Sequence, residues 1–191
     1  MEELKEIIKF LFGFIPWILF LFLSGHTLVS LERSIIISLL ASVIFGFRAL
    51  REGFILQWGT LFFFMACAIT VNLLKSVFVA EYMGIISNGF FASLIWVTIL
   101  IGKPFTLQYA KVELPKEQWG EPGLIRSCRF IAVIWALLMT LSTLISFLRI
   151  LKPGLFPGWV YFDITLGIML GGGIFTTLYK KYKRSQRNSA P

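Results

Sequence analysis

The chain has 191 residues, of which 57% are hydrophobic and 15% charged, and its formal net charge is +8. The apolar share exceeds the ~45–50% of a typical soluble domain, which excludes water as the only solvent for this sequence. The basic residues stand at the ends of apolar runs and in the tail, a distribution that argues against nucleic-acid binding. With His26 as its single histidine and Cys67 and Cys128 far apart, the sequence predicts no metal site, no cofactor and no catalytic triad.

Six apolar runs predict an all-α, polytopic transmembrane helical bundle that forms one membrane domain. A hydrocarbon core of ~30 Å requires about 20 apolar residues, and most of the runs reach that length. The predicted helices cover about residues 7–23, 30–47, 54–74, 82–101, 130–148 and 156–179. The first run contains Pro16 and is followed by Gly25, and the second run is short, so five crossings remain an alternative.

The distribution of Lys and Arg predicts the orientation of the helices. Positively charged loops resist translocation and stay in the cytoplasm. With six crossings, all basic residues fall on one side except Arg33, Lys75, Arg149 and Lys152. The sequence therefore predicts that both termini are cytoplasmic, and the basic tail at 180–191 is interpreted as a topological anchor.

The longest polar stretch is the predicted cytoplasmic loop 102–129, between the fourth and fifth crossings. Pro104 suits the first turn of a helix, and Phe105, Tyr109 and Val112 recur at helical spacing, which predicts a short helix in the membrane interface. Two interpretations remain open, a docking surface for a protein partner or anionic lipid and a structural elbow. The candidate docking residues are Lys103, Pro104, Phe105, Tyr109, Lys111 and Trp119.

Polar residues inside the apolar runs are the next candidates. Asp163 is the only aspartate and lies in the last run, so it is the default candidate for an ion, proton or substrate site. The alternative is a structural ion pair with Lys75, Arg149 or Lys152, or a hydrated carboxylate close to the membrane surface. Asn72 and Asn88 are adequately explained by hydrogen bonds between helices.

Gly167 and Gly171 stand at GxxxG spacing in the last run, which permits close approach of another helix backbone. We expect a contact within the chain, with a homo-oligomer through this face as the alternative. The consecutive glycines Gly171, Gly172 and Gly173 also allow local unwinding, as in transporters.

Short motifs spread over nearly the whole chain carry a family resemblance. They are Phe14-Ile15-Pro16, Lys103-Pro104, Glu113-Leu114-Pro115, Trp119, Trp135 and a final helix that ends in a tyrosine-rich basic tail. In these features the chain resembles the intracellular septation protein A family of small bacterial inner-membrane proteins, or a related family of uncharacterised bacterial membrane proteins. The resemblance implies a protein of the bacterial cytoplasmic membrane that helps to maintain the cell envelope and contacts division or elongation proteins, in a family without known enzymatic activity.

The sequence therefore favours a non-enzymatic accessory or scaffold protein of the cell envelope or septation machinery, surrounded by membrane lipids. A small transporter or channel that uses Asp163 and the glycine-rich last helix is the alternative.

Overall fold

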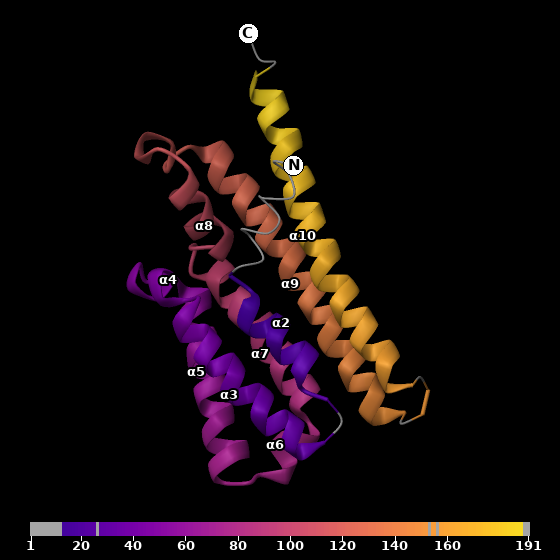
Figure 1. Cartoon of the computed structure of the whole chain (residues 1–191). Coiled ribbons are helices and arrows are strands. Elements are labelled where there is room, and N and C mark those ends of the chain that lie inside the picture. The colour runs from indigo at the N-terminus through magenta and orange to yellow at the C-terminus, as the bar shows by residue number, and fades with distance from the viewer. Residues whose placement is uncertain (1–12, 26, 153, 156, 189–191) are drawn as a thin grey trace.

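The computed structural model describes residues 13–25, 27–152, 154–155 and 157–188, and every regular element in these ranges is helical. The prediction of an all-α fold is confirmed for this part of the chain. Figure 1 shows the helices side by side. Their bounds are α2 (Ile15–Leu23), α3 (Leu28–Ile44), α4 (Phe47–Arg51), α5 (Ile55–Cys67), the π-helix η1 (Ala68–Leu73), α6 (Val77–Glu81), α7 (Met83–Leu100), α8 (Phe105–Glu113), η2 (Lys116–Gln118), α9 (Pro122–Leu151) and α10 (Gly158–Asn188).

Among the described residues, three helical stretches are long and apolar enough to cross a membrane. They are Ile55–Leu73, in which α5 continues into η1, Met83–Leu100 and Pro122–Leu151. This finding agrees with the prediction of a transmembrane protein. The helix α3 has 17 residues, and α10 has 31 residues but carries Asp163 near one end and a basic segment at the other.

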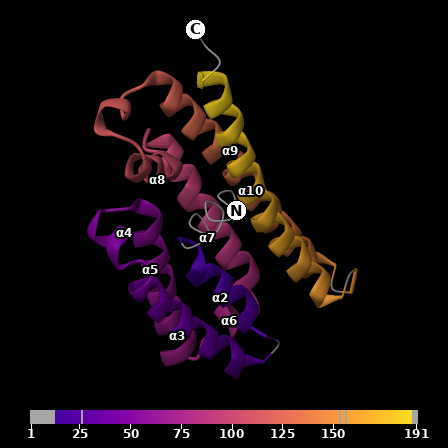
Figure 2. The ribbon, with the colours of Figure 1, turned by 45° about the horizontal axis from the view of Figure 1, so that its top comes forward.

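Successive long helices run in alternating directions, as Figures 1 and 2 show. The helices α2, α5 and α9 run one way, and α3, α7 and α10 run the other way. One end of the bundle, here called the α8 end, contains α4, α8, the start of α9 and the end of α10. The opposite end, here called the α6 end, contains the start of α3, α6 and the end of α9.

Local sequence signals explain several helix boundaries. At the start of α3, the Ser30 backbone N–H donates to Thr27 Oγ1 at 3.1 Å, and the Thr27 N–H donates to Ser30 Oγ at 3.2 Å. This reciprocal capping box satisfies two backbone donors that lack partners within the helix. Gly102 ends α7 in the left-handed region, with φ of 73°, and Pro122 occupies the first turn of α9.

The core is a cluster of aromatic side chains around α2. The ring of Trp17 lies 5.0 Å from that of Phe63 on α5 and 4.7 Å from that of Phe91 on α7, measured between centroids. Phe14 stacks on Trp135 of α9 with centroids 5.3 Å apart. These contacts place the short helix α2 in the middle of the bundle, against three of the longer helices.

Hydrogen bonds between side chains join α9 to α7 and to α10. Trp96 Nε1 on α7 donates to Thr140 Oγ1 on α9 at 3.2 Å. Trp135 Nε1 on α9 donates to Thr176 Oγ1 on α10 at 2.9 Å. Such bonds contribute about 0.6 kcal/mol each between transmembrane helices, where lipid supplies no hydrophobic drive for association.

Several predicted boundaries differ from the structure. The fifth helix begins at Pro122 rather than at Phe130, so the polar loop is shorter than 102–129. The last helix continues to Asn188, so most of the predicted tail at 180–191 is helical, and residues 189–191 lie outside the described part. Apolar run length measures the membrane-embedded part of a helix, whereas polar residues prolong both helices beyond it.

At the start of the chain, the predicted helix bounds differ less from the observed ones. The first predicted helix covered residues 7–23, of which 7–12 lie outside the described residues. The second predicted helix at 30–47 ends at Ile44, and Phe47 begins the separate helix α4.

We expect Gly172→Ala to destabilise the protein by about 1–3 kcal/mol, because an added Cβ would lie 2.9 Å from Trp135 Cζ2 in a packed interface. Gly167→Ala is the matched control, since its Cβ meets nothing within 4 Å and the gain in helix propensity is the same. Thermal unfolding in detergent measures the difference. Equal unfolding temperatures for the two variants would contradict the close contact between Gly172 and Trp135.

Candidate functional site

The helix α8 is held against the bundle by side-chain hydrogen bonds. Thr106 Oγ1 donates to the Cys128 carbonyl on α9 at 2.6 Å, and Gln108 Oε1 accepts from the Ile55 backbone N–H at the start of α5, at 3.1 Å. These two bonds point in different directions from α8. The segment therefore joins the ends of two long helices, which is the geometry of an elbow.

Three of the candidate docking residues belong to the interior. Pro104 and Phe105 are buried, and the Tyr109 ring meets the Phe54 ring edge-on with centroids 5.0 Å apart. A Cβ added at Gly13 would lie 2.8 Å from the Tyr109 hydroxyl oxygen, so this hydroxyl packs directly against backbone. Burial raises the pKa of the Tyr109 phenol above its usual range, because the phenolate would lose its water. Pro104, Phe105 and Tyr109 therefore contribute to packing inside the protein and not to an exposed docking surface.

The surface left open around α8 contains fewer of the candidate docking residues than the sequence suggested. Lys103 is exposed, and Val112 is 53% exposed. Lys111 is half-buried, with Nζ 5.3 Å from the ring centroid of Trp119, and the Trp119 indole N–H donates to the Leu114 carbonyl at 3.0 Å. The exposed α8 surface is therefore defined by Lys103, Lys111 and Val112.

Both candidate asparagines form hydrogen bonds between helices, which confirms that part of the prediction. Asn88 Nδ2 on α7 donates to Ser146 Oγ on α9 at 2.9 Å. Asn72 Nδ2 on η1 donates to the Glu32 carbonyl on α3 at 3.1 Å. The two amides lie in different interfaces and Asp163 is exposed on α10, so these three residues do not converge on one site.

Asp163 is not paired with the cations proposed for it. Lys75 Nζ lies 2.7 Å from Glu32 Oε1, and the Arg149 guanidinium lies 5.5 Å from the ring centroid of Tyr161. Within the described ranges, no ion pair of Asp163 is present. Its carboxylate therefore lies on the outer face of α10 and not on a polar route through the bundle.

The glycine motif of α10 faces outward. A Cβ added at Gly167 or Gly171 meets nothing within 4 Å, whereas Gly172 lies against Trp135. The predicted packing of Gly167 and Gly171 within the chain is therefore wrong, and Gly172 makes that contact. Gly167 and Gly171 instead line an apolar groove of about 460 Å³ between α9 and α10.

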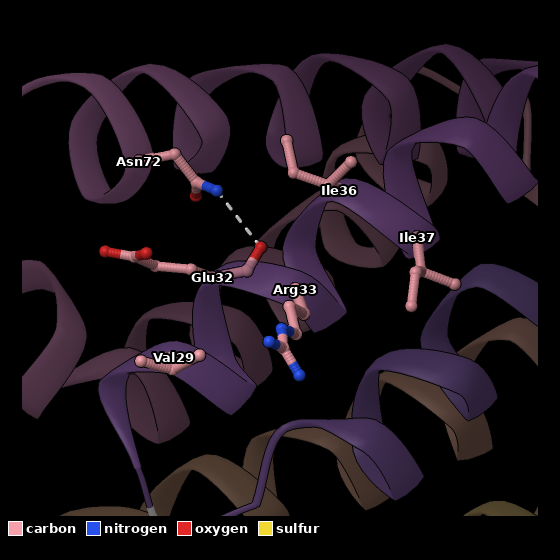
Figure 3. A pocket seen from close by; sticks show the side chains of 6 residues that line it. All are labelled: Val29, Glu32, Arg33, Ile36, Ile37 and Asn72. Carbon is pink, nitrogen blue, oxygen red and sulfur yellow. Dashed lines mark hydrogen bonds between the residues drawn. The ribbon is translucent and has the colours of Figure 1, made fainter.

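A second groove contains polar residues that the sequence reasoning did not connect. It lies beside α3 and η1 near the α6 end and has a volume of about 340 Å³. Figure 3 shows its lining residues, which are Val29, Glu32, Arg33, Ile36, Ile37 and Asn72. The adjacent Glu32 and Arg33 within a largely apolar helix were the signal available in the sequence. Their proximity to Asn72 depends on the fold.

The π-helix positions one wall of this groove. The Leu74 N–H donates to the Ile69 carbonyl at 2.9 Å, one residue further back than in an α-helix. This wider turn carries Asn72, whose Nδ2 reaches the Glu32 carbonyl, while its Oδ1 is buried and has no hydrogen-bond partner among the described residues. Short π-helical segments occur frequently at functional sites.

Comparison with family models, curated proteins and solved structures finds no match to this chain. Among the residues that the structure describes, no group of three His, Cys, Asp or Glu side chains could hold a metal ion. The two candidate sites are the α3–η1 groove, which Arg33 and Asn72 line, and the exposed surface of α8.

Lys75 follows η1 with φ of 52°, a left-handed conformation that costs a non-glycine residue roughly 1–2 kcal/mol. We expect Lys75→Gly to be more stable than Lys75→Ala by about 1 kcal/mol. Both variants lose the ion pair with Glu32, so the difference between their stabilities reports the cost of the left-handed backbone conformation. Thermal unfolding in detergent measures it, and a less stable glycine variant would contradict this backbone conformation.

Proposed function

We propose that the chain crosses a bacterial cytoplasmic membrane six times, with both termini in the cytoplasm. The alternating directions of α2, α3, α5, α7, α9 and α10 support this count. The cations support the orientation, because Lys103, Arg126 and Arg129 stand at the α8 end, whereas Lys75 and Lys152 stand at the α6 end. In this arrangement α8 is a cytoplasmic interfacial elbow.

Single cysteines provide a test of this topology in a background without the two native cysteines, both of which are buried. We expect Leu74→Cys and Lys152→Cys to react with a membrane-impermeant maleimide in intact cells. Lys103→Cys should react only after the membrane is permeabilised, as should a cysteine-containing tag at the N-terminus. Labelling of Lys103→Cys in intact cells would overturn the orientation, and labelling of the tag alone would support five crossings.

We further propose that the protein is a non-enzymatic scaffold of the cell envelope that acts through contacts of its cytoplasmic end. The observation that carries this proposal is the filled interior. Trp17, Phe63, Phe91 and Trp135 occupy the space between the helices, and a transporter needs a continuous polar path there. The exposed polar groups gather instead at the two ends of the bundle.

The family resemblance suggests the partners, which are proteins of the envelope or of the division and elongation machinery. The exposed α8 surface, with Lys103, Lys111 and Val112, is the proposed contact region. Lys103 stands before the start of α8, and Lys111 and Val112 stand near its end. A partner helix that lies along α8 with an acidic and an apolar face suits this arrangement, because both attractions then act together.

In vivo photocrosslinking tests this contact. A photoreactive residue at Val112, which is exposed, should capture one discrete protein partner of the envelope or division machinery. The matched control is the same residue at Tyr109, whose ring packs inside against Phe54, so capture there should remain within the chain. Lys103→Glu should reduce capture from Val112, since it reverses one of the proposed charges.

Two results would count against the scaffold. Capture of lipid alone from Val112 would make α8 only a structural elbow. Capture of the same protein from Val112 with and without Lys103→Glu, in equal yield, would remove the electrostatic part of the proposed contact.

A further inference from the structure

The α3–η1 groove combines an apolar wall with a polar end. Val29, Arg33, Ile36 and Ile37 stand at positions i, i+4, i+7 and i+8 of α3, so they form one continuous helix face. Figure 3 shows Asn72, which belongs to η1, directed toward Glu32 of α3. Exposed aliphatic side chains continue this face away from the polar end, at Leu40 and Ile44.

The charge of the groove comes to one positive unit. Glu32 and Lys75 neutralise each other in the ion pair at 2.7 Å. Arg33 is exposed and forms no ion pair with any described residue. A ligand with a single negative charge therefore complements the groove, and a guanidinium fork binds phosphate oxygens through two parallel hydrogen bonds.

The depth of Arg33 along α3 suits a lipid head group. Arg33 lies five residues after the start of α3 at Leu28, about 8 Å along the helix axis at ~1.5 Å per residue. An arginine at that depth extends its guanidinium toward the membrane interface while its methylene groups stay against apolar surface. Ile36 and Ile37 lie one turn deeper, at the level of acyl chains.

We propose that this groove binds an anionic glycerophospholipid whose head group carries hydroxyl groups, as phosphatidylglycerol does. The phosphate is bound by Arg33, and one acyl chain lies along Ile36 and Ile37. A head-group hydroxyl that enters beside Asn72 supplies the donor that its Oδ1 lacks among the described residues. The inference rests on the proposed membrane location but requires neither the orientation nor the scaffold function.

Native mass spectrometry of the full chain in detergent measures the binding, with dioleoylphosphatidylglycerol and dioleoylphosphatidylethanolamine as probes. We expect tighter binding of the anionic lipid, and about five-fold weaker binding after Arg33→Gln, since one cation near a membrane surface contributes roughly that factor. Lys152→Gln is the matched control because it removes an exposed cation at the same end of the bundle, outside the groove.

A second variant tests the apolar wall. Ile37→Trp places a larger side chain in the groove and should weaken binding of phosphatidylglycerol while the exposed position keeps the fold intact. Equal affinity of the two lipids for the unmodified chain, or an equal effect of Arg33→Gln and Lys152→Gln, would overturn the proposal. Because binding is read in detergent, such a failure is independent of the topology and crosslinking results.

Discussion

The environment of Trp135 is the constraint on which the bundle depends most. Its indole is fully buried, its ring stacks on Phe14 at 5.3 Å, and its Nε1 donates to Thr176 at 2.9 Å. The ring also lies against the backbone at Gly172, where any side chain would collide with it. An indole N–H without a partner would be costly in an apolar interior, so one side chain fixes the positions of α2, α9 and α10 relative to each other.

The same constraint limits what the interior can do. Helices in lipid gain little from apolar contact, so aromatic stacking and side-chain hydrogen bonds hold them together. In this chain those groups fill the space between the helices, with Trp17 against Phe63 and Trp96 bonded to Thr140. Asn88 donates its hydrogen bond across the interface between α7 and α9, so its amide contributes to helix packing rather than to a polar route through the bundle.

The polar groups that a ligand or partner can reach consequently lie at the two ends of the bundle, and these groups differ between the ends. At the α8 end, Lys103 and Val112 are exposed at opposite ends of α8, which Thr106 holds in place. Near the α6 end, Arg33 and Asn72 border a groove with one unbalanced positive charge. We propose a protein partner for the first surface and a lipid for the second, so the two proposed contacts do not compete.

The sequence by itself determined the helical class, the approximate positions of the long helices and the existence of a short helix near Phe105, because run length and helical spacing are local properties. It could not determine which side of a helix meets which neighbour. Only the tertiary structure decided that Tyr109 packs inward, that Gly172 rather than Gly167 faces Trp135, and that Glu32 meets Lys75. These choices depend on the packing of segments far apart in the chain, which no local pattern encodes.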